Sequence, residues 1–332
     1  MDVFKRYVST ALSVLAPYFV PARRAWTLTF IGALLIFYFT FSPFTAVSTK
    51  NTVSIARGTS VSRVAEELAA AHIVAHPGLL EFMLRITGVS TRVQAGTYLF
   101  DTPNNLFVVA YRLVAGAYGL PAVRMTFPEG ITVREMADQV TAAFPGITQK
   151  EFLDEAQLYE GYLFPDTYFF PPSSDATSIV ASMRANFDTK IQTIADEISI
   201  SGRSLSDTVT LASLVEKEAR TTVDRGIVAG ILINRLKLGM PLQVDAVFGY
   251  IYNRDTYSPS LADLSVNSPY NTYLHTGLPP GPIDNPGLDS LQAAAHPTKT
   301  NYLYYLTGKD GLMHYATTYA GHQANRKKYL DI

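Results

Sequence analysis

The chain has 332 residues, of which 48% are apolar and 17% are charged. This length favours about two domains, and the apolar content is high enough to bury a core, which excludes wholesale disorder. With 27 basic and 28 acidic residues, the formal net charge of −1 argues against a nucleic-acid-binding protein. The sequence has no cysteine, which excludes disulfides, zinc–thiolate sites and cysteine nucleophiles and fits an oxidising compartment.

An uncharged, mostly apolar segment at residues 25–49 dominates the N-terminal region. About 20 apolar residues are enough for a helix to cross the hydrocarbon layer of a membrane. Arg23 and Arg24 directly precede the segment and favour an orientation with residues 1–24 in the cytoplasm, while Trp26 lies where an interfacial aromatic anchor is expected. We therefore expect one transmembrane helix at 25–49, embedded in the lipid bilayer.

A cleaved signal peptide is the alternative for the same segment. The small residues Ala46 and Ser48 follow the apolar run at the spacing of a cleavage site. The apolar part of a signal peptide usually has about 7–15 residues, however, and this one is longer, which favours an uncleaved anchor. In both cases we expect residues 50–332 to meet extracytoplasmic substrates.

Two segments repeat one pattern at an offset of 72 residues, which separates Gly58 from Gly130. Each predicts a short strand, a glycine turn, a Ser or Thr N-cap and an amphipathic helix. The first copy continues through a second helical stretch at 77–87 to a strand at 95–100. This order of strand, helix, helix and strand resembles a LysM-like module, the kind that holds N-acetylated glycans, and we assign it to residues 50–120. A packing domain without a ligand is the alternative.

A predicted helix at 211–220 carries the candidate catalytic group. Its apolar residues at positions i, i+3 and i+4 define a buried stripe, formed by Leu211, Leu214 and Val215. Position i+7 of that stripe is Glu218. A carboxyl on an apolar face loses solvation, which raises its pKa toward the range that a general acid needs near neutral pH.

The spacing also separates the two glutamates of this helix. We expect Glu216 to face solvent and Glu218 to face the interior. The alternative for Glu218 is a structural ion pair with an arginine of the next helix, such as Arg235. Spacing alone does not decide between the catalytic and the structural role.

Residues 242–245 alternate between apolar and polar and predict a strand, with Gln243 and Asp245 on one face. These two side chains would either line a polar cleft or lie on an ordinary surface strand. A Pro- and Gly-rich loop follows at 268–287 and excludes helix or central strand there. Its aromatic and amide side chains suit a rigid loop over a carbohydrate groove, and a purely structural loop is the alternative.

Other catalytic signatures are missing from the sequence. Four of the six histidines lie after residue 270, and no two have the H-E-x-x-H spacing of a zinc peptidase. The nucleotide-binding glycine motifs and the serine-nucleophile elbow are also missing. We therefore expect no metal site and no cofactor.

Several ordered blocks match a known family over about residues 50–330. They are Glu160–Tyr168, Leu211–Glu218, Ile233–Leu236, Leu242–Asp245, Tyr270–Tyr273, Gly277–Gly281, Ile283, Asn285–Gly287 and Ala293–Pro297. On these blocks the chain resembles the YceG-like endolytic murein transglycosylases, the membrane-bound lytic transglycosylase G type. Several rare blocks in one order make this resemblance far more specific than any single motif.

The resemblance implies an α+β fold with a LysM-like domain and a catalytic transglycosylase domain at 121–332. It implies a lyase of the bacterial inner or plasma membrane that cuts nascent peptidoglycan glycan strands and leaves 1,6-anhydro-MurNAc ends, without a cofactor and with cell-wall synthases as partners. The catalytic glutamate maps to Glu218. The substrate-binding residues expected from the loop, the strand and the matched blocks are Asn234, Gln243, Asp245, Tyr270, Asn271, Tyr273, Pro279, His296, His314 and His322.

Two departures from the family's pattern concern substrate contacts. A Thr commonly follows the Gln-x-Asp block two residues after the Asp, and Val247 stands there instead. In the last block Gly321 stands where an acidic residue is frequent, and the segment from His314 to His322 is a residue short.

Two other functions remain open. A water-dependent muramidase would use Asp245 as the base opposite Glu218 and would release reducing ends. A non-catalytic glycan-binding scaffold of the cell-wall machinery would hold strands through the LysM-like unit and leave them uncut.

Overall fold

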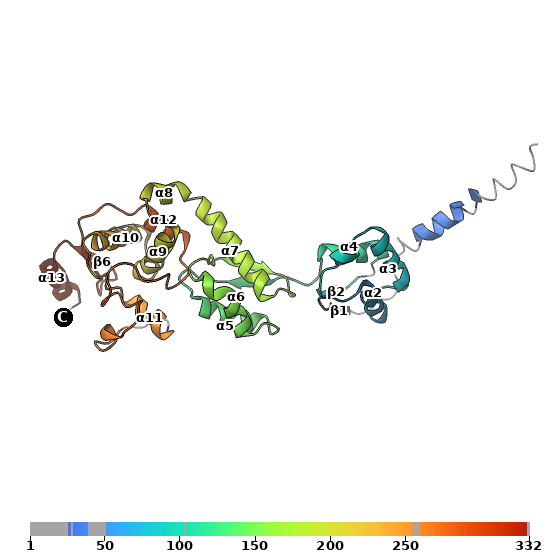
Figure 1. Cartoon of the computed structure of the whole chain (residues 1–332), viewed down its shortest axis with the longest axis horizontal. Helices are drawn as coiled ribbons and strands as arrows, with labels where there is room; N and C mark the ends of the chain where they lie inside the picture. Colours follow the sequence, from blue (N-terminus) through green and yellow to red (C-terminus); the bar gives the residue numbers. More distant parts are fainter. Residues whose placement is uncertain (1–25, 28, 39–50, 103, 255–258, 331–332) are drawn as a thin grey trace, which may run out of the picture. The chain divides into compact units, whose positions relative to one another are not determined.

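The computed structural model describes residues 26–27, 29–38, 51–102, 104–254 and 259–330 (Figure 1). Helices and short antiparallel sheets are mixed throughout, which confirms the predicted α+β class. Each sheet in these residues has two strands. The chain divides into two compact units, Met1–Pro121 with Pro171–Ser173, and Ala122–Phe170 with Ser174–Ile332. We call them the N-terminal and the C-terminal unit.

The segment predicted to cross a membrane is described only in part. Residues 26–27 and 29–38 are helical and largely exposed. No helix in the described part of the chain combines the length and the apolar character that a membrane span requires. Residues 1–24, 25, 28 and 39–49 of the predicted cytoplasmic segment and anchor lie outside the described residues, so the anchor stays a prediction.

The N-terminal unit contains a strand–helix–helix–strand arrangement. Its elements are β1 (Asn51–Ile55), α2 (Val61–Ala70), α3 (Pro77–Ile86), the short 3-10 turn η1 (Ser90–Arg92) and β2 (Gly96–Phe100), followed by α4 (Leu106–Ala115). The strands pair antiparallel, and the Ser60 side chain caps α2 by accepting the Arg63 N–H. Buried side chains of both strands and all three helices, among them the fully buried Leu68 and Tyr98, form one core.

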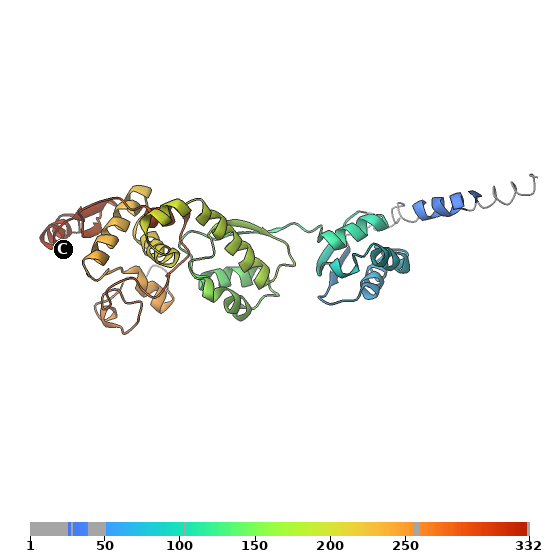
Figure 2. The same ribbon diagram turned by 45° about the horizontal axis from the view of Figure 1, so that its top comes forward.

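The C-terminal unit begins with a second arrangement of the same order. It consists of β3 (Val123–Thr126), α5 (Val133–Ala143), α6 (Gln149–Ala156), the 3-10 turn η2 (Gln157–Tyr159) and β4 (Thr167–Phe170). Thr132 and Glu135 form the capping box expected from their spacing, which starts α5 where the sequence predicts it. The long helix α7 (Ala176–Gln192) packs on α6 (Figures 1 and 2) and contributes Ile179 and Met183 to the core of this arrangement.

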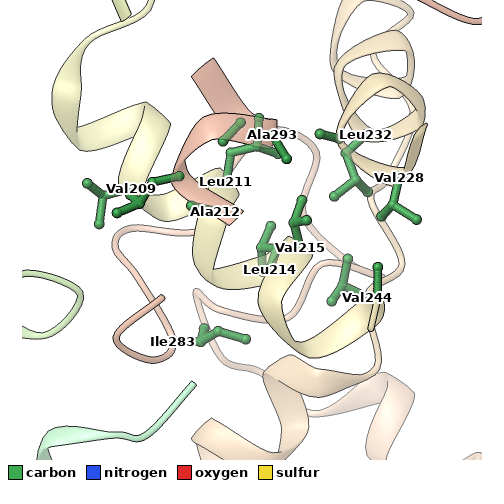
Figure 3. Close-up of a cluster of buried hydrophobic side chains, with 14 of the residues drawn as sticks. Val209, Leu211, Ala212, Leu214, Val215, Val228, Leu232, Val244, Ile283 and Ala293 are labelled. Atoms are coloured by element: carbon green, nitrogen blue, oxygen red, sulfur yellow. The ribbon is translucent and has the colours of Figure 1, made fainter. Parts of the chain in front are cut away.

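The rest of the C-terminal unit is mainly helical. Its helices are α8 (Ala195–Ser201), α9 (Leu205–Glu218), α10 (Thr222–Lys237), α11 (Ala246–Tyr252), the 3-10 turn η3 (Asp263–Ser265), α12 (Leu288–Ala295) and α13 (Tyr319–Tyr329), with the hairpin β5 (Tyr304–Thr307) and β6 (Met313–Ala316) before α13. Helix α9 is central, because α10, α11 and α12 all pack against it. Its expected stripe of Leu211, Leu214 and Val215 is fully buried (Figure 3). Each such side chain contributes about 1.5–3 kcal/mol by leaving water.

Candidate active site

A groove of about 660 Å³ opens beside the end of α9. Glu218, the last residue of α9, lines it together with residues of α11, of the loop around Tyr270 and of the first turns of α5. Ala219 has an extended backbone and Thr221 already caps α10, so a tight corner ends α9 at Glu218. The sequence therefore places one carboxyl at a helix end, directed into a polar groove.

The half-buried carboxyl of Glu218 has an unusual acidity. Burial disfavours its charged form and raises its pKa to about 7, and the nearby negative charge of Asp245 adds to the rise. The Tyr305 hydroxyl and the Ala246 N–H donate hydrogen bonds to the carboxyl and act in the opposite direction, as does the charge of Arg235. The carboxyl can thus both give and take a proton near neutral pH, as its position on the apolar stripe predicts.

Asp245 lines the same groove and directly precedes α11. Its Oδ1 accepts a hydrogen bond from the Tyr273 hydroxyl, and this bond together with burial raises the pKa of that phenol. Tyr273 therefore holds the Asp245 carboxylate in place beside Glu218.

The predicted strand at 242–245 is wrong. Only Pro241 forms an isolated bridge there, and Gln243 has a left-handed backbone with φ of 52°. Leu242 and Val244 are buried while Gln243 and Asp245 are exposed, so the alternation reflects burial without a sheet partner. The Gln243 N–H is bound by the Thr272 carbonyl at 3.1 Å, and its side chain does not line the groove.

Arg235 and Asn234 of α10 donate hydrogen bonds to backbone carbonyls. Arg235 donates to the carbonyls of Leu303 and Leu242, each at 2.7 Å, and it forms no ion pair with Glu218 among the described residues. Asn234 donates to the Thr300 carbonyl at 2.8 Å. Both side chains tie the strand that carries Tyr305 to α10, and neither lines the groove.

The expectation that Glu216 faces solvent is also wrong. Its side chain is only 5% exposed and forms a 2.6 Å ion pair with Arg225 of α10. It also accepts the Gly287 N–H at 2.9 Å. Arg225 also pairs with Asp289 at 2.8 Å. The charge of the buried Glu216 carboxylate is therefore balanced by an arginine from another helix, a partner that the helical pattern alone could not reveal.

The loop at 268–287 contributes one of its four expected residues to the groove. Tyr270 lines the groove, whereas the buried Asn271 amide braces the loop by donating to the carbonyls of Leu264 and Val266. Tyr273 acts on Asp245, and Pro279 is buried. Asn271 and Pro279 thus support the shape of the loop, as the alternative of a structural loop expects.

None of the three candidate histidines lines the groove that contains Glu218. His296 lines a separate pocket of about 430 Å³ together with Asp289. His314 bonds Asp310 at 2.9 Å, and His322 stacks on a tyrosine of β5. Within the described residues, no group of three acidic or histidine side chains has the arrangement of a metal site.

The site also contains three residues that the sequence did not single out, of which Tyr250 and Arg134 line the groove. Tyr305 reaches Glu218 from β5, Tyr250 lies on α11, and Arg134 lies on α5. Tyr305 is next to Glu218 because the segment that precedes β5 packs tightly on α10. A Cβ atom at Gly230 of α10 would approach the carbonyl oxygen of Thr298 in this segment to 2.2 Å. Such long-range proximity leaves no local sequence pattern.

Comparison with known proteins identifies the family. The YceG-like family matches residues 53–328 of the chain. The chain belongs to the YceG-like family. This confirms the resemblance found in the ordered sequence blocks.

Among YceG-like relatives, the endolytic murein transglycosylase of Bacillus subtilis (strain 168) is 32% identical over 306 residues, which cover 84% of both proteins. The endolytic murein transglycosylase of Streptococcus pneumoniae serotype 2 is 28% identical over 322 residues, which cover 84% of this chain and 58% of that relative. A crystal structure of a yceG-like protein from Listeria monocytogenes matches with a TM-score of 0.57 and 30% identity, over 83% of this chain and 99% of the other.

Proposed function

We propose that the chain is an endolytic murein transglycosylase, a lyase that cuts the MurNAc–GlcNAc bond inside peptidoglycan glycan strands. The observation that carries this proposal is a single half-buried carboxyl, Glu218, whose pKa of about 7 suits it to donate and accept a proton at the same place. The named activities of the B. subtilis and S. pneumoniae relatives support the same reaction.

In the first step the protonated Glu218 donates its proton to the glycosidic oxygen. The bond from that oxygen to C1 of MurNAc breaks, GlcNAc leaves with a free hydroxyl, and C1 becomes oxocarbenium-like. The resulting Glu218 carboxylate is stabilised by the hydrogen bonds of Tyr305 and Ala246. The negative charge that forms at Glu218 then lies close to the developing positive charge of the sugar.

In the second step the Glu218 carboxylate takes the proton of the MurNAc C6 hydroxyl. The C6 oxygen attacks C1 and closes the 1,6-anhydro ring, and Glu218 is again protonated. Because no water enters, a second carboxylate is not needed to activate one. Burial serves both steps, because it keeps the protonated form populated near pH 7.

A water-dependent muramidase is the second candidate. It is favoured by the position of Asp245, which lines the same groove as Glu218 and lies close enough to raise its pKa. In such an enzyme Asp245 would activate a water on the opposite face of the sugar.

Three further assignments belong to this proposal. The enzyme is a single-pass protein of the bacterial inner or plasma membrane, anchored by 25–49 with 1–24 in the cytoplasm; the uncharged run after Arg23 and Arg24 supports this. The N-terminal unit is LysM-like and holds the glycan strand, which its strand–helix–helix–strand order supports. The substrate is the nascent, uncrosslinked strand.

The experiment is mass spectrometry of the products from uncrosslinked strands. The proposal expects muropeptides one water, about 18 Da, lighter than hydrolysis products, and no cleavage by Glu218→Gln, which keeps the shape and loses the proton. Reducing ends would establish the muramidase instead. Strands that are retained but uncut would establish a binding scaffold, and cleavage by Glu218→Gln would refute the role of Glu218.

A further inference from the structure

The two strand–helix–helix–strand arrangements have the same strand register. Asn51 pairs with Phe100 in the first sheet, and Val123 pairs with Phe170 in the second. In both sheets the next three pairs follow in the same register, each one residue further along the first strand and one residue back along the second. A shift of one residue would move every side chain to the other face of a strand, so equal register places equivalent side chains in both cores.

Matching hydrogen bonds strengthen the correspondence. In each sheet two hydroxyls meet across the strands, Ser54 with Thr97 at 2.7 Å and Thr126 with Thr167 at 2.8 Å. In each second strand a tyrosine hydroxyl donates to the carbonyl four residues earlier, at 2.8 Å and 2.7 Å. We name residues 51–100 the first copy and residues 123–170 the second copy of one fold.

Asn285, in the loop before α12, fixes the second copy to the rest of the C-terminal unit. The Asn285 carbonyl accepts the Gly130 N–H, and its own N–H donates to the Ile131 carbonyl, each at 2.9 Å. The Asn285 amide donates to Glu160 and accepts the Leu163 N–H, again at 2.9 Å. Asn285 thus joins the loop before α5 to the loop before β4, and this docking brings the start of α5 to the groove.

Arg134 is the uncommitted charge on that part of α5. It is exposed, lines the groove and makes no hydrogen bond or ion pair with any described residue. Its acidic neighbours are engaged: Glu135 accepts the Thr132 N–H at 2.7 Å, and Asp138 accepts the Gln149 amide at 2.8 Å. The charge of Arg134 also acts on the buried carboxyl of Glu160, but no hydrogen bond or ion pair joins these two residues. The exposed guanidinium therefore keeps its donors available to an anionic group of the substrate.

The first copy has no such charge at the equivalent position. Ser62 stands there, and its hydroxyl donates to Glu81 within the N-terminal unit at 2.7 Å. The arginine therefore belongs to the copy that lines the groove. It is not a general requirement of the fold.

Aromatic residues also line the groove. Tyr250 and Tyr270 pack with their ring centroids 5.0 Å apart. Arg134 lines the same groove as this aromatic pair. Aromatic faces suit sugar rings, and a cation beside them suits an acidic substituent of the sugar.

We propose that Arg134 forms a subsite for a carboxylate of the stem peptide carried by muramic acid. The second copy then serves as a wall of the catalytic groove that selects strands with acidic peptides. This inference rests on the proposed function, because it assumes that the groove holds a peptidoglycan strand.

The test compares two substrates with the full-length, detergent-solubilised chain. One is uncrosslinked strands with native stem peptides, and the other is the same strands after their carboxylates have been converted to amides. Arg134→Gln should lower kcat/KM on native strands roughly tenfold, mainly through KM, because it loses one charge-assisted contact. It should leave kcat/KM on amidated strands unchanged, and Arg134→Lys should recover part of the loss.

The matched control is Arg124→Gln, which changes an exposed arginine of the same copy outside the groove and should leave both substrates unaffected. An equal loss on native and amidated strands, or no loss on native strands, would overturn the inference. The same comparison can be made without cleavage. Binding of native and amidated strands is measured for Glu218→Gln and for the double variant that also carries Arg134→Gln. Failure of the unaltered chain to cut either substrate would instead count against the proposed function.

Discussion

The Tyr305 hydroxyl donates a hydrogen bond to the carboxyl of Glu218. The two residues are far apart in the sequence and meet because Arg235 and Asn234 of α10 hold the backbone around Leu303 and Tyr302. Tyr305 therefore acts on the proton-transfer group from a separately anchored strand. A donor that faces a carboxylate stabilises the charged form and lowers its pKa.

Tyr305→Phe is expected to raise the pKa of Glu218 further above about 7, because the hydrogen bond that stabilises the carboxylate is lost. The first chemical step needs the protonated acid, so kcat/KM of the unaltered enzyme falls as the pH rises through about 7. In the variant this fall moves to higher pH, and kcat decreases because the carboxylate formed in the first step is less stable. The measurement is the pH dependence of both constants.

Tyr304→Phe is the control, since Tyr304 precedes Tyr305 on the same strand and stacks on His322 away from Glu218. Its pH profile should match that of the unaltered enzyme. A pH profile of Tyr305→Phe that does not move would show that the hydroxyl has no influence on the proton-transfer group.

The sequence predicted features that depend on neighbouring residues of one helix. The capping box of Thr132 and Glu135 and the buried stripe around Leu214 follow from spacings of three and four residues, which a helix turns into contacts. The raised pKa of Glu218 follows from the same stripe. The ordered family blocks added the class of reaction, which no single spacing carries.

What the sequence could not predict depends on other elements. Glu216 is buried because Arg225 arrives from α10, and a helical face alone says nothing of that partner. Gln243 breaks the predicted strand because its backbone is left-handed, a conformation that no pattern of apolar residues reports. Tyr305 reaches Glu218, and Arg134 reaches the groove, through packing of distant segments. The repeat at an offset of 72 residues predicted the strand, turn and first helix of both copies, and the strand register adds that their closing strands correspond as well.

Glu216→Gln is expected to lower the free energy of unfolding by about 1–3 kcal/mol at pH 7, because it removes one carboxylate from a largely buried arginine. Arg225 keeps Asp289, which limits the loss. Asp188→Asn is the control: it removes an exposed i,i+4 pair with Arg184 and should cost less than about 1 kcal/mol. Urea unfolding measures both, and equal small losses would contradict a structural role for Glu216.

Asp284 is fully buried, and neither of its carboxylate oxygens has a hydrogen-bond partner among the described residues. Burial raises its pKa well above the usual value of 3.8, although the charge of Lys217 opposes this. Because the folded-state pKa is the higher one, its contribution to stability is complete below about pH 4 and is lost as the pH rises through the folded-state pKa.

Asp284→Asn removes this titration and should therefore gain in Tm relative to the parent between pH 4 and pH 8. Melting curves at pH 4, 6 and 8 measure the gain. Asp154→Asn, an exposed position paired with Lys150, should show no such trend. Parallel melting temperatures of Asp284→Asn and the parent across this range would contradict a buried carboxyl that resists ionisation.

Asp245→Asn separates the two candidate reactions. Asp245 raises the pKa of Glu218, so the variant is expected to move the fall of kcat/KM to lower pH, opposite to Tyr305→Phe. Asparagine can still accept the Tyr273 hydroxyl bond, which preserves the local geometry. If Glu218 performs both proton transfers, the variant keeps activity within roughly tenfold and still releases 1,6-anhydro ends, as mass spectrometry would detect. If Asp245 activates water, the same variant loses cleavage as completely as Glu218→Gln, because each carboxyl then carries one of the two proton transfers.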